Sequence, residues 1–314
     1  MEKPVCISIV SPAYKCAGCI EELYRRLTTT LRGMNVTYEV IFIDDGSPMN
    51  DWEVIERICQ QDPNLRGVKL SRNYGQHFAI TAGLDRVQGD WVVVMDCDLQ
   101  DQPEEIPKLY AKALEGWPIV LARRHLRQDG LYRRFASLLF ARIYNWLGDV
   151  DMDSRIANFS ICSREVIAAV NQFRERNRSF PMFLNEAGFR RTAIDVEHAS
   201  RFSGASSYSF SKLLDFAIQN IVARSNKPLR LSIKFGFLLS LLSITFAIKL
   251  VFNYFFFSVR VEGWTSLAVL ISFLGGLGFA NLGIMGLYLG KIFDEAKGRP
   301  LYIVETELVG GISR

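Results

Sequence analysis

Two carboxylates one residue apart, Asp96 and Asp98, follow an apolar run and are followed in turn by the amide of Gln100. Carboxylate and amide oxygens are ligands that Mg²⁺ and Mn²⁺ prefer. If a strand continues through these residues, its period of two places all three side chains on one side. A cation held there would neutralise a diphosphate and help it to leave. Acidic pairs at strand ends are also common as solvated turn residues, so the spacing alone leaves both interpretations open.

Two further apolar runs end in polar residues. Ser11-Pro12-Ala13-Tyr14 closes the first run, and Asp44-Asp45-Gly46-Ser47 closes the second. In open α/β sheets, ligands bind beyond the carboxyl ends of the strands. We therefore expect these two stretches and the Asp96-Cys97-Asp98 triplet to line one edge of a sheet.

The elements that must position these residues follow from hydrophobic periodicity. Apolar, β-rich runs alternate with stretches of helical spacing, which predicts βαβ units and a mostly parallel sheet. The strands are expected at 5–11, 38–44, 65–70, 91–96 and 119–122, and the helices at 20–31, 52–61, 77–87 and 103–114. A helical pattern at 131–147 and mixed α/β structure at 155–198 extend the domain. The expected fold class is α/β, of nucleotide-binding type.

The last third of the chain is more apolar. Residues 233–257 and 267–289 are each long enough to cross a hydrocarbon core, which takes roughly 20 apolar residues. Lys249 lies towards one end of its stretch, where it can reach the interface. The short link 258–266 makes the pair a transmembrane hairpin. Glycines in the second helix (Gly275, Gly276, Gly278, Gly283 and Gly286) favour close packing within the hairpin or between subunits of a homo-oligomer.

Basic residues lie mainly outside this pair: Lys212, Arg224, Lys227, Arg230, Lys234, Lys291, Lys297 and Arg299, against Arg260 in the link. The positive-inside rule then predicts a multi-pass protein of the cytoplasmic (inner) membrane, with its catalytic domain and C-terminus in the cytoplasm. Residues 211–224 have a broad apolar face that suits either a helix at the membrane surface or a buried one. The expected organisation is a catalytic domain (1–210), an interfacial helix and linker (211–230), the hairpin (231–290) and a cytoplasmic tail (291–314).

Composition excludes some classes of function. A formal net charge of +4 is too small to indicate nucleic-acid binding. Six scattered cysteines suit a reduced cytoplasmic domain, so we expect no disulfides. Cys16 and Cys19 have CxxC spacing, but the sequence offers no obvious second ligand pair for zinc.

Several motifs, in order along the chain, resemble the family 2 glycosyltransferases with the GT-A fold. They are Pro12-Ala13-Tyr14, Asp44-Asp45-Gly46-Ser47 and Asp96-Cys97-Asp98. Three more resemble the branch that glycosylates polyprenyl phosphates, which includes dolichyl-phosphate mannose synthases and bacterial undecaprenyl-phosphate glycosyltransferases: Ser71-Arg72-Asn73-Tyr74-Gly75, Ala82-Gly83-Leu84 and Asp98-Leu99-Gln100-Asp101-Gln102-Pro103-Glu104. The resemblance implies inverting, metal-dependent transfer of a sugar from a nucleotide sugar to a membrane-bound polyprenyl (undecaprenyl) phosphate. The product would serve the glycosylation of a surface polysaccharide.

The resemblance also implies roles for individual residues. The donor would contact Pro12, Tyr14, Asp44, Asp45, Ser47 and Asp96, and Mg²⁺ or Mn²⁺ would be held by Asp96, Asp98 and Gln100. The acceptor phosphate would meet Arg134, Ser137, Arg201 and Ser206, the last two in a loop that spans 201–208. Asp98, Arg124 and Arg201 would act in catalysis.

The chain departs from the family pattern at three places. Ser207 replaces a lysine of the loop, Lys15-Cys16 replaces Asn-Glu, and Asn158 replaces an aspartate. These changes leave open a second acceptor, a hydroxyl of a lipid-linked glycan. That acceptor needs a general base, for which Asp101, Asp153 and Glu186 are candidates. A third interpretation is a non-catalytic membrane scaffold or sensor with the same fold.

Overall fold

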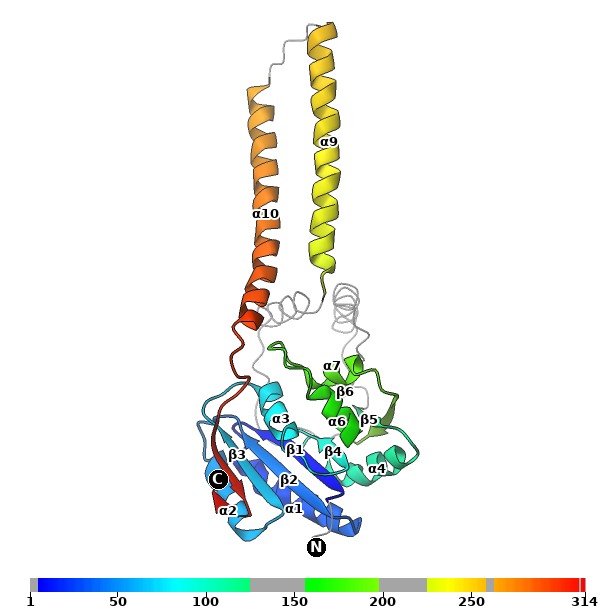
Figure 1. Ribbon diagram of the computed structural model, residues 1–314, viewed down its shortest axis with the longest axis vertical. Helices are drawn as coiled ribbons and strands as arrows, with labels where there is room; N and C mark the ends of the chain where they lie inside the picture. The colour runs from blue at the N-terminus through cyan, green and yellow to red at the C-terminus, as the bar shows by residue number, and fades with distance from the viewer. Residues whose placement is uncertain (1–4, 125–155, 198–224, 258–262, 311, 314) are drawn as a thin grey trace. The chain divides into compact units, whose positions relative to one another are not determined.

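The computed structural model describes residues 5–124, 156–197, 225–257, 263–310 and 312–313. The chain divides into two compact units (Figure 1). One, the α/β unit, comprises residues 1–128, 152–206 and 299–314, and the other, the helical unit, comprises residues 129–151 and 207–298. The expected helices at 131–147 and 211–224 lie outside the described residues.

The α/β unit is built on a sheet of nine strands in the order β7-β5-β6-β4-β1-β2-β3-β8-β9 (Figure 1). Its centre, β4-β1-β2-β3, is parallel, whereas β6 runs antiparallel to both β4 and β5. The strands are β1 (Ile7–Ala13), β2 (Tyr38–Asp44), β3 (Leu65–Leu70), β4 (Trp91–Val94), β5 (Ile119–Arg124), β6 (Ile156–Ser163), β7 (Arg191–Val196), β8 (Val304–Val309) and β9 (Ile312–Ser313).

Helices cover both faces of this sheet. They are α1 (Ala17–Gly33), α2 (Asp51–Gln61), α3 (Gln76–Leu84), α4 (Ile106–Leu114), α6 (Arg164–Val170) and α7 (Phe180–Glu186), with a 3₁₀ turn, η1 (Pro103–Glu105), before α4. In β2, Val40 and Phe42 join an apolar cluster with α1 and α2, whereas Ile41 and Ile43 join a second cluster with α3. Strand alternation thus gives this sheet two apolar faces and explains why β2 is buried throughout.

Gly83 shows why the Ala82-Gly83-Leu84 motif needs its glycine. A Cβ built there would lie 2.5 Å from Val10 Cγ1 and 2.8 Å from Ile43 Cδ1. Helix α3 can therefore pack directly on β1 and β2 only because this position has no side chain. This close packing fixes where α3 begins, at the edge of the sheet.

The predicted α/β fold is confirmed, with its five expected strands and four expected helices present to within a few residues. The sheet, expected to be mostly parallel, is parallel in its centre, but β6 and β8 pair antiparallel with their neighbours. Strand β4 ends at Val94, two residues before the expected end. The C-terminal residues also differ from the expected separate tail, because β8 pairs antiparallel with β3. Glu307 of β8 accepts a 2.8 Å hydrogen bond from Arg86 Nε, which follows α3. The chain thus returns to the α/β unit after the helical unit.

The helical unit contains two long helices, α9 (Lys227–Phe257) and α10 (Trp264–Ala296). Ser232 hydrogen-bonds Asn281, and Tyr288 donates a 2.5 Å hydrogen bond to the carbonyl of Ser225. Since the start of α9 thus meets the C-terminal half of α10, the two helices run antiparallel as a hairpin. Both extend beyond the predicted spans.

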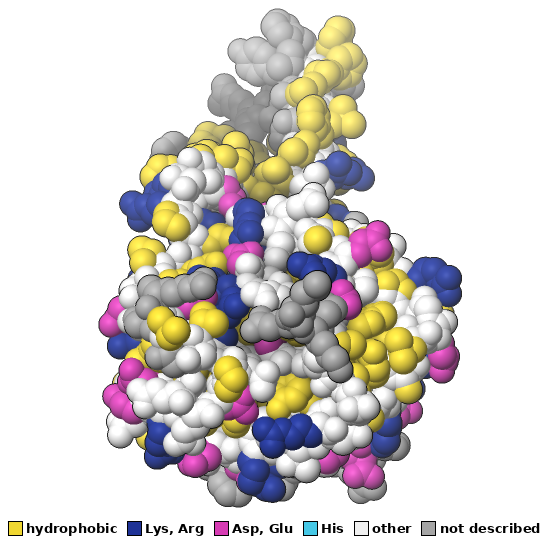
Figure 2. All heavy atoms as spheres, turned by 60° about the horizontal axis from the view of Figure 1, so that its bottom comes forward, with side chains coloured by type: hydrophobic (Ala, Val, Ile, Leu, Met, Phe, Trp, Pro, Cys, Tyr) yellow, Lys and Arg dark blue, Asp and Glu magenta, His cyan; other side chains and the backbone are white. Residues whose placement is uncertain are grey.

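The described parts of α9 and α10 are long and apolar enough to cross a membrane, with windows Lys227–Phe246 and Phe273–Ala296 of mean hydropathy 1.6 and 1.4. Large apolar side chains on them are exposed, among them Phe237 and Phe279, each at 75%. Figure 2 shows apolar side chains gathered on the helices, whereas basic and acidic ones are interspersed over the visible face of the α/β unit. A Cβ at any of the six α10 glycines, the five noted above and Gly290, would meet no atom within 4 Å, so among the described residues they do not pack closely against α9.

Candidate active site

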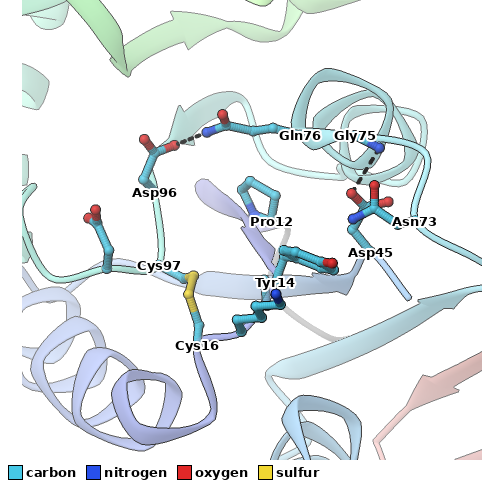
Figure 3. Close-up of a pocket in the computed structure, with 12 residues that line it drawn as sticks. Pro12, Tyr14, Cys16, Asp45, Asn73, Gly75, Gln76, Asp96 and Cys97 are labelled. Atoms are coloured by element: carbon cyan, nitrogen blue, oxygen red, sulfur yellow. Dashed lines mark hydrogen bonds between the residues drawn. A yellow bond between two sulfur atoms is a disulfide. The ribbon is translucent and has the colours of Figure 1, made fainter. Parts of the chain in front are cut away.

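A pocket of about 520 Å³ lies where the carboxyl ends of β1, β2, β3 and β4 meet (Figure 3). Its lining comes from the residues that end or follow these four strands: Pro12, Ala13, Tyr14, Lys15, Cys16, Asp45, Asn73, Gly75, Gln76, Asp96, Cys97 and Asp98. The expectation that the polar strand ends line one edge is therefore confirmed. The volume lies within the range of typical small-molecule sites.

The turn after β2 is tied to its neighbours by its polar side chains. Both oxygens of Asp45 accept backbone hydrogen bonds, 2.7 Å from Tyr74 N and 2.9 Å from Gly75 N. Gly46 has φ +60°, and a Cβ there would lie 2.3 Å from the carbonyl carbon of Arg72, so only glycine fits. The Asp45-Gly46 pair thus holds the loop between β3 and α3 against the pocket.

Asp44 lies just behind this turn, at 1% exposure, and does not line the pocket. Its Oδ1 accepts a 2.9 Å hydrogen bond from Ser47 N. Ser47 Oγ in turn accepts a 3.1 Å hydrogen bond from Lys15 N, which joins the turns after β1 and β2. Burial raises the pKa of Asp44 to about 6, against the lowering effect of the Ser47 amide, and burial raises the pKa of Asp45 as well.

The Asp96-Cys97-Asp98 triplet lies in the turn after β4 rather than in the strand. Nevertheless, Asp96, Asp98 and Gln100 are half-buried, whereas Cys97 and Leu99 between them are buried. The alternation expected of a strand therefore persists into the turn. Leu99 has φ +62°, a left-handed conformation that a residue other than glycine keeps only when its surroundings impose it.

Asp96 is held by two amide side chains (Figure 3 shows the first). Gln76, the first residue of α3, donates to Asp96 Oδ1 at 2.6 Å, and Asn158 of β6 donates to the same oxygen at 3.2 Å. Asp98 Oδ1 accepts a 3.2 Å hydrogen bond from Gln100 N. Two neutral donors on one oxygen orient the Asp96 carboxylate.

The charges around the pocket suit a divalent cation. Its lining carries three carboxylates, Asp45, Asp96 and Asp98, and one ammonium group, that of Lys15. A diphosphate would meet net negative charge there unless a cation lay between. Within the described residues, no group of three or more His, Cys, Asp or Glu side chains is gathered for a metal. Mg²⁺, however, is commonly bound by one or two carboxylates together with substrate phosphates. Asp96 and Asp98 can supply these carboxylates.

The expectation of no disulfides is wrong. Cys16 and Cys97 form a disulfide across 81 residues of sequence, and both line the pocket (Figure 3). The sequence pattern could not reveal this pair because its two residues come together only when β4 lies beside β1 in the sheet. Cys19, the CxxC partner of Cys16, is buried in the core and is a free thiol.

The predicted site residues fall into three groups. Pro12, Tyr14, Asp45, Asp96 and Asp98 line the pocket together. Asp44, Ser47 and Gln100 support it from neighbouring turns, and Arg124 ends β5, where its backbone pairs with Val196 of β7. Arg134, Ser137, Arg201 and Ser206 lie outside the described residues, as does Ser207.

Sequence reasoning missed four contributors: Gln76, Asn73, Cys16 and Lys15 line the pocket without having been assigned a role there. Gln76 directly follows the Ser71–Gly75 motif, so extending that motif by one residue would have found it. Asn158 was noted only as the loss of a carboxylate, whereas its amide contacts Asp96. Of the candidate bases, Asp101 is buried at 2% exposure and does not line the pocket, and Glu186 is exposed at the end of α7.

Comparison with known proteins agrees with this arrangement. Residues 8–189 match the family model described as Glycosyl transferase family 2. The chain is 35% identical to an uncharacterized glycosyltransferase of Synechocystis sp. (strain ATCC 27184 / PCC 6803 / Kazusa), over 95% of this chain and 94% of the relative. It is also 35% identical to the undecaprenyl-phosphate 4-deoxy-4-formamido-L-arabinose transferase of Pseudomonas fluorescens (strain SBW25), over 96% of this chain and 90% of that one.

Among solved structures, the chain is similar to glucosyl-3-phosphoglycerate synthase from Mycobacterium tuberculosis in complex with Mn²⁺, uridine diphosphate and phosphoglyceric acid. The identity is 19%, the TM-score is 0.47, and the match covers 69% of this chain and 76% of that one. The expected α/β fold of GT-A type, followed by two apolar helices, is confirmed. The family match covers more than half of the chain, and the relatives match it almost from end to end. This protein therefore belongs to glycosyl transferase family 2.

Proposed function

We propose that this glycosyltransferase transfers a sugar from a nucleotide-sugar donor to a polyprenyl phosphate, using a divalent cation, with inversion at the anomeric carbon. The observation that carries the proposal is the pocket at the strand ends, which gathers Asp45, Asp96 and Asp98 in a chain that matches undecaprenyl-phosphate sugar transferases over nearly its whole length. The product would serve the glycosylation of a surface polysaccharide.

The donor fits the pocket in both size and chemistry. The turn of Asp45 and the ring of Tyr14, which is 42% exposed, offer polar and aromatic surface for a nucleoside. The ammonium of Lys15 lies 5.4 Å from the centre of the Tyr14 ring, where it can approach a phosphate. Lys15 takes the place of an uncharged asparagine in the family motif, so it adds a positive charge that the pattern does not require.

Asp96 and Asp98, with Gln100 behind them, are the residues that would hold Mg²⁺ or Mn²⁺. When bound, the cation neutralises charge on the diphosphate that departs. The contribution of the chain itself is orientation, because Gln76 and Asn158 fix the Asp96 carboxylate before any ligand enters.

An acceptor that needs no general base suits this pocket. A lipid phosphate carries its own nucleophilic oxygen, which attacks the anomeric carbon as the bond to the nucleoside diphosphate breaks, so no general base is needed. The pocket carboxylates are already engaged in other contacts: Asp45 with two backbone amides, Asp96 with two side-chain amides, and Asp98 with Gln100 N. Asp101 is buried and does not line the pocket, and its Oδ2 accepts from Asp96 N at 3.5 Å. Arg134, Arg201, Ser137 and Ser206 remain the proposed contacts of the acceptor phosphate, with Arg124 and Arg201 as catalytic groups.

The apolar hairpin is proposed to anchor the enzyme in the cytoplasmic membrane, with the catalytic domain on the cytoplasmic side. Helices α9 and α10 are antiparallel, so both connections to the α/β unit start from the same end of the pair. This topology suits a hairpin that enters and leaves a membrane on one side. The basic residues on its outer flanks favour the cytoplasmic face.

The direct test uses the purified full chain in lipid vesicles, a panel of labelled nucleotide sugars, and two acceptors, undecaprenyl phosphate and an undecaprenyl-linked oligosaccharide. We expect label on undecaprenyl phosphate from one donor, in the presence of Mg²⁺ or Mn²⁺. Label on the oligosaccharide alone would support the hydroxyl acceptor, which the Ser207 and Asn158 replacements favour. Donor binding without transfer to either acceptor would support a sensor or scaffold.

A further inference from the structure

We infer that Cys16 and Cys97 form a reversible thiol–disulfide modification site in the wall of the pocket, and that its oxidised form holds the Asp96–Asp98 turn in place for the donor. The substrate of this site is a low-molecular-weight disulfide, or a dithiol in the reverse direction. The effect on donor affinity rests on the proposed function, whereas formation of the bridge does not.

The bridge joins two turns that carry the pocket. Cys16 precedes α1 directly and follows Tyr14 and Lys15, while Cys97 stands between Asp96 and Asp98. Their Cα atoms are 6.5 Å apart, within the range that a disulfide spans without backbone movement. Both residues line the pocket, Cys16 half-buried and Cys97 at 5% exposure, so exchange with a small disulfide would begin at the more exposed Cys16. In Figure 3 the bridge lies below Asp96 at one side of the pocket, with Pro12 and Tyr14 between it and Asp45.

Both turns carry backbone that is held in an uncommon conformation. Lys15, next to Cys16, has φ +58°, and Leu99, two residues after Cys97, has φ +62°. Such residues keep left-handed backbone only where surrounding contacts impose it. On the Cys16 side one such contact is the 2.9 Å hydrogen bond from Cys16 N to Asp51 Oδ2. On the other side the bridge fixes the middle residue of the triplet, so opening it removes a constraint from both metal-binding carboxylates at once.

Reversibility rests on the proposed cytoplasmic location of the α/β unit. Thiols in the cytoplasm are kept reduced, and disulfides found there are usually transient and redox-sensing or catalytic. A free thiol, Cys19, follows Cys16 by three residues. Burial raises the pKa of Cys19 and thereby disfavours its reactive thiolate form. Exchange therefore starts at the two pocket cysteines rather than within the CxxC pair.

The chemistry is ordinary thiol–disulfide exchange. One pocket thiolate attacks a small disulfide, which breaks its S–S bond and releases one thiol. The second pocket thiolate then attacks the mixed disulfide, which forms the Cys16–Cys97 bond and releases a second thiol. The two protein thiols are oxidised, the small disulfide is reduced to two thiols, and the two protons pass to those thiols.

The test compares the full chain in detergent after treatment with oxidised glutathione or with dithiothreitol, each then removed. The variants are wild type, Cys97→Ser and, as a matched control, Cys6→Ser, which removes a half-buried thiol outside the pair. Three quantities are measured: the Cys16–Cys97 cross-link by mass spectrometry of non-reduced peptides, amide hydrogen exchange of residues 96–101, and affinity for UDP, GDP and CDP with Mn²⁺.

We expect the cross-link only in oxidised wild type and oxidised Cys6→Ser. In these two proteins, oxidation should slow exchange in 96–101 and tighten nucleotide binding by about five- to thirtyfold, the effect of ordering one backbone residue. Cys97→Ser should show the same hydrogen exchange and the same nucleotide affinity under both treatments. Four results would overturn the inference. They are a missing cross-link, a Cys16–Cys19 bridge in its place, unchanged hydrogen exchange after cross-linking, and nucleotide binding that is equal or weaker in the oxidised protein. If no nucleotide binds in either state, the proposed function fails, and the cross-link and the exchange rates still decide this inference.

Discussion

The side-chain amide of Gln76 donates a 2.6 Å hydrogen bond to Asp96 Oδ1, although 20 residues separate the two in the sequence. The contact joins the first residue of α3 to the turn that follows β4. It fixes one oxygen of a carboxylate that we assign to the cation. The position of α3, and with it the Gln76 amide, depends on the close packing that Gly83 allows.

Removing this amide should weaken donor binding rather than the fold. For Gln76→Ala we expect the KM for the nucleotide sugar to rise about five- to tenfold, or about 1 kcal/mol, the net contribution of one ordinary hydrogen bond. Gln76→Glu should be worse, because it places a second carboxylate against Asp96. Steady-state kinetics at several Mn²⁺ concentrations measure both effects. Gln60→Ala, an exposed glutamine in α2, is the control, and equal KM values for Gln60→Ala and Gln76→Ala would refute the positioning role.

Asn158 should limit the negative charge around Asp96. In Asn158→Asp, a new carboxylate would face Asp96 at the position of the present 3.2 Å contact, so we expect a loss of about 1 kcal/mol of unfolding free energy without metal. Saturating Mg²⁺ should restore most of this loss, since the cation lies between like charges. Thermal unfolding with and without Mg²⁺ measures the difference. The control Asn185→Asp adds the same charge on an exposed residue of α7, and a Mg²⁺-dependent shift as large in that variant would contradict the prediction.

His77 predicts a pH dependence of stability. Burial, aided by the charge of Arg178, lowers its pKa from 6.5 to about 4. Between these values the unfolded chain binds a proton that the folded chain does not, so stability falls as the pH decreases from 6.5 towards 4. The raised pKa of Asp44 acts in the opposite direction between its ordinary value and about 6, but it is shared by both proteins compared here.

We therefore expect His77→Gln to lose about 2 kcal/mol less unfolding free energy than wild type on going from pH 7.5 to pH 5. Denaturant unfolding of the full chain in detergent at the two pH values gives the four energies required. Identical pH dependence in both proteins would show that His77 is protonated normally in the folded chain.

How far the sequence could predict this protein depends on the range of each interaction. Strands and helices of the first 124 residues follow from local periodicity, and the edge on which the site lies follows because parallel strands end together. The contacts of Asp96 with Asn158 and of Cys16 with Cys97 depend on the order of strands in the sheet, since β6 and β1 flank β4. No local pattern encodes that order. Strand β8 was missed because Glu305 and Glu307 give it the composition of a solvated tail.

Those two glutamates differ in what they stabilise. The side chain of Glu307 is 21% exposed and accepts from Arg86 Nε at 2.8 Å, whereas that of Glu305 is 49% exposed and pairs with Lys69 at 3.0 Å. We expect Glu307→Gln to destabilise the α/β unit by about 1 kcal/mol, and Glu305→Gln by less than about 0.5 kcal/mol, because exposed pairs contribute little. Thermal unfolding of the two variants provides the comparison. Equal effects would mean that β8 is held by its backbone pairing with β3 alone.

Metal-dependent sugar transfer to a lipid phosphate is the central claim, and the most direct measurement is the label extracted with undecaprenyl phosphate after incubation with the active nucleotide sugar. Four reactions suffice: wild type with Mn²⁺, wild type with EDTA, Asp98→Asn with Mn²⁺, and Asp90→Asn with Mn²⁺, in which the changed aspartate precedes β4 at the opposite edge of the sheet. The account predicts labelled lipid in the first and last reactions and a loss of at least about a hundredfold in the other two, as for removal of a main electrostatic contact to the transition state. Labelled lipid formed equally well by Asp98→Asn, or in EDTA, would contradict it.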